Sequence, residues 1–275
     1  MRIDTTMTYT NGAGESVRFA ADSPWHYGST DLRDHEWKAD TVNDRVVGFR
    51  LRPREFSLEA VMDGASPAER DRMVDVFDHD VIAGEPGTLR AGSSEMRCWV
   101  IAAEKDLWWY DGGHMRAKLT VRADDPVWTR ETVAQFRRSP GVASGGDLDY
   151  PHGYPHDWKN DDVYGSLSSP YRRPCAARIT VYGPAVNPYV IIGTNRYQVD
   201  SSVPERGLLV IDGRARTIVS MDEYGRPENA FSRGVRAEGA NIFAKVPAGS
   251  SPVSWGGQFG FDVALVEERS EPAWS

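Results

Sequence analysis

Short runs in which apolar and polar residues alternate recur along the whole chain, separated by Gly, Pro, Asn and Asp. Side chains of a β-strand point alternately to two faces, so this period of two indicates strands with one buried face. In residues 177–183, for example, Ile179 and Val181 fall on one face, and Tyr182 falls on the other. The pattern therefore predicts a mainly β protein. The clearest runs are 46–62, 96–104, 114–123, 177–183, 207–213 and 259–268.

One stretch has the periodicity of a helix. Ser66 stands at the N-cap, Pro67 at the first helical position and Glu69 three residues after the cap, which is a capping box. Gly84 follows as a plausible residue to end the helix. We therefore expect a single amphipathic helix over about 66–83, packed against a sheet. Its expected buried stripe is Met73, Val74, Phe77 and Val81.

The β pattern stops after Trp128 and resumes at Cys175. The intervening residues are rich in Pro, Gly, Tyr and Asp and show no periodicity, which is typical of a linker or a long arm. We expect two β-sandwich domains: an N-terminal β domain over 1–133 that carries the helix, and a C-terminal one over 176–275. Residues 134–175 are the expected linker.

The two β regions close with similar tetrapeptides, residues 125–128 (DPVW) and 271–274 (EPAW). Proline ends strand pairing because it has no backbone N–H, and the following tryptophan is suited to pack as an anchor. Trp128 and Trp274 are therefore expected to fold back on their domains. Four residues are too few to indicate a duplication.

Composition narrows the classes of function. The 275 residues carry a formal net charge of −8, which disfavours a nucleic-acid backbone or an anionic membrane as the partner. The first ten residues lack the apolar segment of a signal peptide, and no apolar run reaches the roughly 20 residues of a membrane span. We expect a soluble chain made in a cytoplasm. Its two cysteines, Cys98 and Cys175, are expected to be buried free thiols.

No stretch carries a convincing catalytic or metal-binding motif. His152 and His156 lie near several aspartates in the expected linker, but Pro and Gly between them do not fix a ligand geometry, and a surface loop is the favoured interpretation. The nucleophile elbow, the phosphate-binding loop and the dinucleotide-binding loop are all missing. Paired carboxylates for glycoside hydrolysis stay open, but none of the 40 acidic residues forms a distinctive pair. We predict no catalytic residue, no cofactor and no metal.

The aromatic segment 107–113 (LWWYDGG) raises the question of ligand stacking. Its Asp-Gly step lies between two strand-like runs and indicates a tight hairpin turn. Along a strand, Trp109 faces one side while Trp108 and Tyr110 face the other, so the three rings do not form one platform. We favour packing in the core or against another subunit, with ligand stacking as the alternative.

Several segments, in this order, give the chain a resemblance to a known family. They are FRLRPREFSLEAVMDG, the capped helix, EMRCWVIAAEKDLWWYDGGHMRAKLTVRADDPVW, ARITVYGPAVNPYVIIG, GLLVIDGRARTIVSMDEYGRPENAF and IFAKVPAGSSPVSWGG. The ordered set resembles the distal tail proteins of long-tailed bacteriophages. LDYPHGYPHDW and the ending SEPAW further resemble minor tail proteins of phages that infect actinobacteria.

The resemblance implies a structural virion protein of the tail tip, made in the cytoplasm of the bacterial host, and no enzyme. Members form a hexameric ring from the N-terminal domain, with a galectin-like β-sandwich outside it. The implied partners are other copies of the chain, the tail tube, tail hub and tape-measure proteins, and receptor-binding components. A carbohydrate-binding module or adhesin is the alternative, motivated by nine Trp and eleven Tyr. Neither a membrane nor a specific nucleic-acid sequence is an expected partner.

Overall fold

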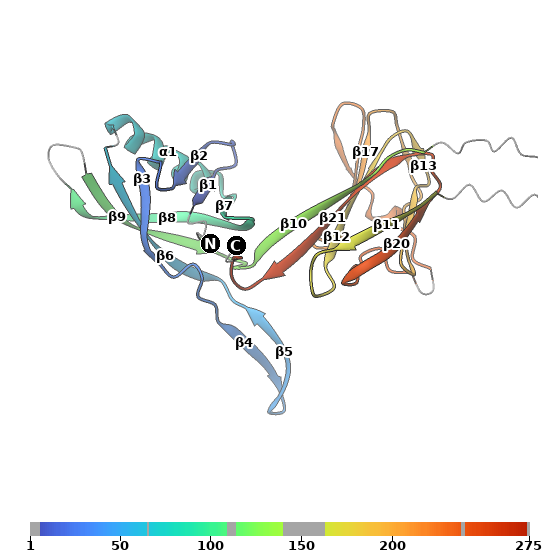
Figure 1. Cartoon of the computed structure of the whole chain (residues 1–275), viewed down its shortest axis with the longest axis horizontal. Coiled ribbons are helices and arrows are strands. Elements are labelled where there is room, and N and C mark those ends of the chain that lie inside the picture. The colour runs from blue at the N-terminus through green and yellow to red at the C-terminus, as the bar shows by residue number, and fades with distance from the viewer. Residues whose placement is uncertain (1–5, 65, 109–113, 140–162, 238–239, 274–275) are drawn as a thin grey trace, which may run out of the picture. The chain divides into compact units, whose positions relative to one another are not determined.

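The computed structural model describes residues 6–64, 66–108, 114–139, 163–237 and 240–273. The chain divides into two compact units, which we call unit 1 (1–130 and 268–275) and unit 2 (131–267). The described residues form strands throughout, one α-helix and one short 3-10 turn (Phe231–Arg233), so the chain is mainly β as predicted (Figure 1). The one described α-helix is too short and too polar to cross a membrane.

Unit 1 is built on a sheet that closes on itself. Its strands follow one another in the order β8-β7-β1-β2-β3-β6-β9, and β9 pairs back with β8. The strand pattern led us to expect a sandwich, but the closure gives a barrel-like sheet. The prediction differed because the alternation of apolar and polar residues does not encode which distant strands pair. The strands are β1 (Met7–Thr10), β2 (Ser16–Phe19), β3 (Trp25–Thr30), β6 (Arg54–Asp63), β7 (Gly87–Ala91), β8 (Ser94–Trp108) and β9 (His114–Ala123).

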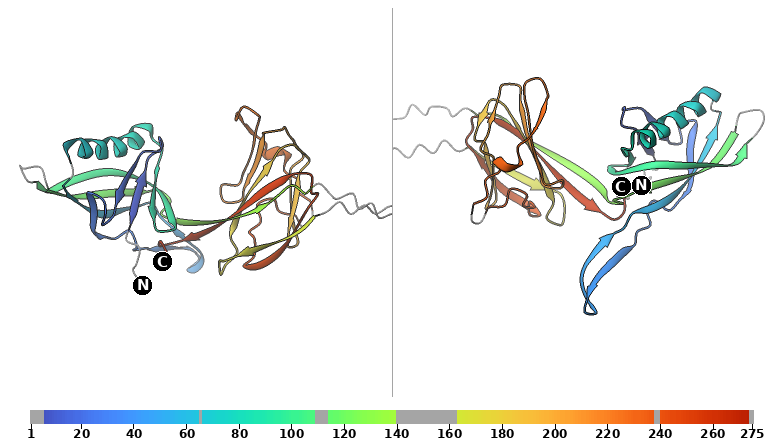
Figure 2. Two further views of the ribbon diagram at one scale, coloured as in Figure 1. Left: turned by 45° about the horizontal axis from the view of Figure 1, so that its top comes forward. Right: turned by 180° about the vertical axis from the view of Figure 1, so that it is seen from behind.

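The helix α1 (Pro67–Ala83) lies over this sheet and begins as predicted (Figure 2). Ser66 Oγ accepts from the Glu69 N–H, and the Glu69 carboxylate accepts from the Ser66 N–H at 2.7 Å. Gly84 ends the helix in the left-handed conformation at φ 69°. The buried apolar side chains of this helix belong to the single hydrophobic core of unit 1.

The predicted buried stripe of α1 is wrong at two positions. Met73 and Phe77 are buried as expected, but Val74 and Val81 are exposed. The other buried positions are Val76 and Asp80, so the helix is rotated toward a face that contains a carboxylate. The buried face of α1 therefore combines apolar side chains with the Asp80 carboxylate.

The predicted single run over 46–62 is also wrong, because it forms two strands. β5 (Arg45–Leu51) pairs with β4 (Trp37–Val42), whereas β6 joins the closed sheet. Pro53 lies between them, and its missing N–H interrupts the ladder. The chain therefore leaves the closed sheet at the hairpin and rejoins it at β6, which is separated from β5 by two residues.

Unit 2 contains two antiparallel sheets around one core. One runs β19-β18-β17-β12-β21-β10 and the other β11-β20-β14-β15, with a separate pair β13–β16. Buried residues from both sheets, such as Ile179 and Val190, belong to the same cluster. β10 (Trp128–Phe136) and β21 (Gly260–Arg269) cross the boundary between the units. The remaining strands are β11 (Val163–Ser169), β12 (Ala176–Tyr182), β13 (Ala185–Val186), β14 (Tyr189–Ile192), β15 (Asn195–Gln198), β16 (Ser202–Val203), β17 (Leu208–Asp212), β18 (Thr217–Met221), β19 (Pro227–Asn229) and β20 (Gly249–Trp255).

The expected linker 134–175 contains regular structure at both of its ends. β10 extends into it, and β11 pairs along its whole length with β20. In β11 only Leu167 and Ser169 are buried, so the segment lacks the strong apolar alternation that marks the other strands. Residues 140–162 lie outside the described residues.

Candidate functional site

The most distinctive surface of unit 1 is the hairpin formed by β4 and β5. The two strands pair only with each other, as a two-stranded sheet separate from the closed sheet. The hairpin projects away from the rest of unit 1 (Figure 1). Its turn is Asn43-Asp44, both with positive φ, which is the geometry of a tight hairpin turn.

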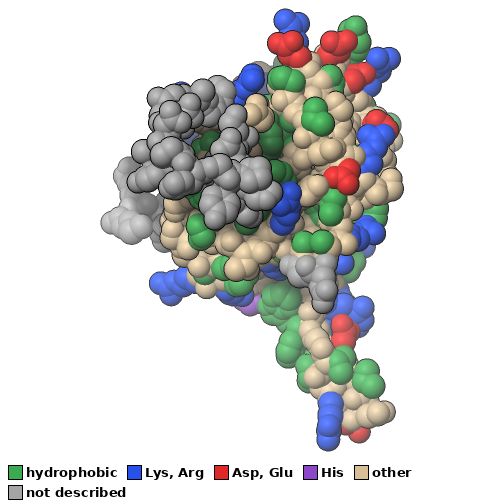
Figure 3. All heavy atoms as spheres, turned by 90° about the vertical axis from the view of Figure 1, so that its right-hand side faces the viewer, with side chains coloured by type: hydrophobic (Ala, Val, Ile, Leu, Met, Phe, Trp, Pro, Cys, Tyr) green, Lys and Arg blue, Asp and Glu red, His purple; other side chains and the backbone are tan. Residues whose placement is uncertain are grey.

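One face of the hairpin is apolar and open to solvent. The strand register pairs Trp37 with Leu51 and Ala39 with Phe49, which places all four side chains on the same face. The Trp37 side chain is 49% exposed and that of Phe49 is 64% exposed. Figure 3 shows hydrophobic side chains gathered along the projecting hairpin. Single exposed apolar residues are ordinary, but a contiguous row on an isolated hairpin marks an interaction surface.

A bulge lengthens this apolar surface toward the turn. The register shifts between Asp40 and Thr41, where β5 contains an additional residue. Val46 and Val47 lie at this point, and both are more than half exposed.

The opposite face of the hairpin is charged. Arg50 pairs with Asp40 at 3.0 Å, and Lys38 pairs with Glu36 at 2.9 Å. The hydrogen bond and charge of Lys38 hold the pKa of the Glu36 carboxyl below its usual range. The hairpin thus has one face suited to water and one suited to burial against another surface.

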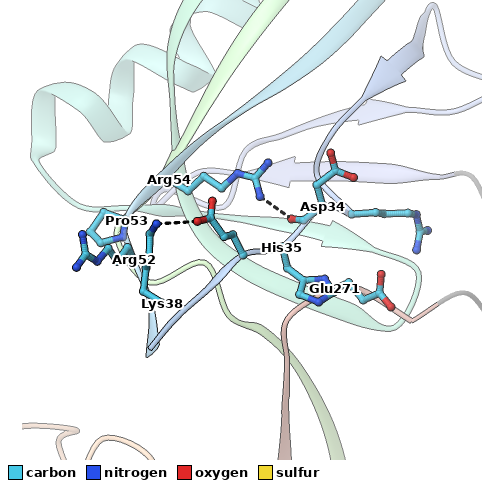
Figure 4. A pocket seen from close by; sticks show the side chains of 9 residues that line it. Asp34, His35, Lys38, Arg52, Pro53, Arg54 and Glu271 are labelled. Atoms are coloured by element: carbon cyan, nitrogen blue, oxygen red, sulfur yellow. Dashed lines mark hydrogen bonds and ion pairs between the residues drawn. The ribbon is translucent and has the colours of Figure 1, made fainter. Parts of the chain in front are cut away.

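A polar cleft of about 830 Å³ lies where the hairpin joins unit 1 (Figure 4). Its lining includes Arg33, Asp34, Lys38, Arg54 and Glu271. Arg54 Nη1 donates to the Asp34 carbonyl at 3.0 Å, and Arg33 Nη1 donates to the carbonyl of Pro272 at 3.3 Å. These bonds connect the base of the hairpin to the chain's last described segment and help to position the hairpin.

A buried carboxylate holds α1 to the sheet on its inner side. Asp80 is 1% exposed; its Oδ2 accepts from the Tyr9 hydroxyl at 2.6 Å and its Oδ1 from the Gly12 N–H at 2.8 Å. His79 Nδ1 lies 3.1 Å from the same Oδ1. A Cβ at position 87 would collide with both Asp80 and Tyr9, so only glycine fits there. These hydrogen bonds stabilise the buried charge of Asp80 and fix the position of α1 against the β1–β2 turn.

The contacts within this network shift the pKa values of Asp80 and Tyr9. Burial raises the pKa of Asp80, but the hydrogen bonds from Gly12, Tyr9 and His79 outweigh it, and the net pKa is lowered. Burial and the Asp80 carboxylate raise the pKa of Tyr9, so its hydroxyl stays a donor. Sequence reasoning missed Asp80, although an aspartate three residues after Phe77 on the apolar face was a usable signal.

The structure does not test whether Trp108, Trp109 and Tyr110 serve in packing or in ligand stacking. Trp108 ends β8 and pairs with Met115 in the predicted hairpin of β8 and β9, but its side chain is not described. Trp109 and Tyr110 lie outside the described residues, as do His152 and His156. Within the described ranges, no group of three or more His, Cys, Asp or Glu side chains is arranged to hold a metal ion.

The structure describes one of the two expected tryptophan anchors and both cysteines. Trp128 is fully buried in the core of unit 1, as predicted, whereas Trp274 lies outside the described residues. Cys98 and Cys175 are both buried and free, as predicted. Burial raises the pKa of the Cys98 thiol to about 12.

No protein-family model matches the chain, and no curated protein matches it in sequence. Its fold, in contrast, is that of solved proteins from phage adsorption apparatus and baseplates. The Dit protein of phage SPP1, described as a paradigm of the hub adsorption apparatus in phages of Gram-positive hosts, matches with a TM-score of 0.54. The match covers 96% of this chain and 98% of that one, at 11% identity.

Chains of the phage p2 baseplate give the same result. In its activated conformation with calcium, a baseplate chain matches with a TM-score of 0.57 and 10% identity, over 97% of this chain and 99% of that one. The form with strontium matches with a TM-score of 0.55 at 11% identity over the same shares. The resemblance to phage distal tail proteins is therefore confirmed at the level of fold, over nearly the whole chain.

Proposed function

We propose that this protein is a structural component of a phage tail tip, where six copies form a ring that joins the tail tube to the tail hub. The observation that carries the proposal is the fold likeness over 96–97% of the chain to proteins of phage hub and baseplate assemblies. A match over both whole chains supports a shared role better than a match of one unit. The protein would thus be part of the virion, made in the host cytoplasm.

Unit 1 is the part that we assign to the ring. Its closed sheet leaves few free strand edges for pairing with other chains, so contacts between copies need another surface. The β4–β5 hairpin offers one, with its apolar face open to solvent. We propose that this face is buried against another chain in the assembled tail tip.

Unit 2 is proposed to be a galectin-like β-sandwich that docks receptor-binding components. Two antiparallel sheets that share one core support the sandwich assignment. The tail tube, hub and tape-measure proteins would contact the ring rather than this unit. These partners follow from the family resemblance.

The role that we propose requires no catalysis. It rests on contacts between proteins, and the fold neighbours are themselves components of adsorption assemblies. The alternative, a carbohydrate-binding module, depends on Trp108, Trp109 and Tyr110, and no observation on these residues favours it. A glycan array probed with the whole chain tests that alternative directly.

The proposal is tested by the mass of the purified chain in solution, measured by light scattering, with negative-stain images of the same fractions. We expect particles of six times the 30.6 kDa chain mass with a central hole. A chain that stays single at all concentrations and does not assemble on tail tube or hub protein would contradict the ring.

A further inference from the structure

The two sheets of unit 2 differ in charge. The four strands of the sheet β11-β20-β14-β15 contain one charged residue, Arg196 of β15. In the other sheet, charged residues occur on β10, β12, β17, β19 and β21. Because 26% of the whole chain is charged, a sheet with a single charge is a distinct surface of this protein.

One face of this sheet belongs to the core and the other points to solvent. Leu167, Val190 and Val253 are buried on the inner face. Side chains alternate along each strand, so the residues between the buried ones point outward. The strand registers align four outward residues in one row across the sheet, namely Tyr164, Ser254, Ile191 and Arg196. The row makes the outer face a continuous surface that crosses all four strands.

Hydroxyl groups cover much of this outer face. Ser166, Ser168 and Ser250 are exposed on β11 and β20. Ser166 Oγ and Ser250 Oγ lie 2.9 Å apart and share a hydrogen bond. Tyr164 is 68% exposed. A hydroxyl both donates and accepts, so the face offers hydrogen bonds in either direction without presenting a charge.

Arg196 ends the row, and its guanidinium is held in place. The guanidinium carbon lies 4.1 Å from the centre of the Tyr189 ring, and Nε donates to Gln198 Oε1 at 2.7 Å. The Gln198 amide is fixed in turn, because its Nε2 donates to Asp200 Oδ1 at 2.9 Å. A guanidinium held by an aromatic ring and one hydrogen bond loses little freedom when its other N–H groups bind a ligand.

The composition of this face distinguishes between classes of ligand. A polyanion is bound by clustered Lys and Arg, whereas the face has one Arg. The centre of a protein interface is apolar and depleted in serine, whereas serine is the commonest outward residue here. A neutral polysaccharide fits better. Its hydroxyl groups pair with those of serine and tyrosine, and the apolar faces of its sugar rings pack on tyrosine.

We infer that the outer face of this sheet binds a neutral polysaccharide whose chain crosses the four strands from Tyr164 to Arg196. Three strand spacings separate these two residues, or about 14 Å, which gives room for more than one sugar ring. In a tail-tip protein the ligand would be a glycan of the host surface. The inference concerns unit 2 alone, does not depend on the ring, and involves none of Trp108, Trp109 and Tyr110.

An array of bacterial polysaccharides, neutral and acidic, probed with the whole chain tests the class of ligand. We expect binding to be confined to neutral members. Binding to no neutral member, or equal binding to acidic ones, would overturn the inference. If no neutral member binds and Tyr164→Ala weakens assembly of the chain in native mass spectrometry, the face is a protein interface instead.

Two variants test the position of the site, with the neutral array member that binds best as the probe. Tyr164→Ala removes the exposed ring and should weaken binding about tenfold. Arg196→Ala removes a charged donor and should weaken it by about tenfold or more. Isothermal titration measures the dissociation constant, and circular dichroism checks that both variants keep their fold.

Unit 2 contains a matched pair of control residues outside this sheet. The Arg226 guanidinium lies 5.1 Å from the centre of the Tyr224 ring, and Tyr224 is 74% exposed. Tyr224→Ala and Arg226→Ala should leave the dissociation constant within about twofold of its original value, because both lie away from the site. If Tyr164→Ala and Arg196→Ala bind as tightly as the original chain, or lose no more than the controls, the polysaccharide binds elsewhere and the inference is wrong. Both site variants should assemble like the original chain, so a failure of polysaccharide binding and a failure of the ring are separate results.

Discussion

Strands β5 and β6 are separated by two residues and have similar patterns, yet they end in opposite environments. In β6, Phe56, Leu58 and Ala60 point into the core of unit 1 and are buried. In β5, Val47 and Phe49 alternate in the same way and stay exposed. Alternation therefore predicts that one face of a strand will be covered, but it does not say whether the cover comes from the same chain. In β5 the cover is missing, which is why we assign it to another chain.

The largest predicted effect compares one phenylalanine from each strand. Phe56→Ala should lower the free energy of unfolding by about 3–5 kcal/mol, because it leaves a cavity in the core. Phe49→Ala should change it by less than about 0.5 kcal/mol in the single chain, because the ring is already in water. Urea unfolding of dilute protein measures both. Equal losses would mean that the hairpin is packed within its own chain.

The second prediction concerns the buried side of α1. Asp80→Ala should cost about 2–4 kcal/mol, because the Tyr9 hydroxyl and the Gly12 N–H lose their acceptor. The conservative Asp80→Asn variant keeps an acceptor and should lose less. Unfolding free energies at pH 7 measure the difference between the two.

The same carboxylate predicts a pH dependence. Its pKa in the folded chain is lower than its ordinary value of 3.8, so the unfolded chain binds the proton more tightly. The stability that it contributes is therefore present above about pH 4 and is lost as the pH falls through the folded pKa. Between pH 5 and pH 2, the Asp80→Asn variant should lose less stability than the original chain. An identical loss in both would exclude this role.

The start of α1 gives a smaller effect. Ser66→Ala removes half of the capping box and should cost about 1 kcal/mol. Glu69→Gln retains an acceptor for the Ser66 N–H and serves as the control. Thermal unfolding followed by circular dichroism distinguishes the two variants, and a larger loss in the control would show that charge rather than the cap matters.

The smallest effect is expected on the charged face of the hairpin. Arg50→Ala removes the pair with Asp40, in which both side chains are largely exposed, and should change stability by less than about 0.5 kcal/mol. It should also leave assembly intact, since this face points to water. A loss of assembly in this variant would show that the charged face of the hairpin, and not its apolar face, contacts another chain.

Much of the fold of the described residues could be predicted from the sequence. The capping box at Ser66 and Glu69 gives the start of α1, and alternation gives β9, β12 and β21 nearly to the residue. These features depend on neighbours in the chain. The closure of the sheet in unit 1 could not be predicted, because it depends on β9 pairing with both β6 and β8.

The candidate site was harder to predict for the same physical reason. Reading 46–62 as one strand hid the hairpin, although Pro53 was a signal for the break. Val74 and Val81 have the hydrophobicity of core residues, and the sequence alone does not show that both side chains are exposed. Trp109 and Tyr110 of the aromatic segment lie outside the described residues and contribute no evidence to the site.

The most direct test of the account compares the original chain with Phe49→Asp by native mass spectrometry at equal concentration. We predict six times the chain mass for the original protein and the mass of one chain for the variant, with the same unfolding temperature for the two when dilute. An original chain that assembles alongside a variant that assembles equally well would contradict the claim that the open face of the hairpin is buried by another copy.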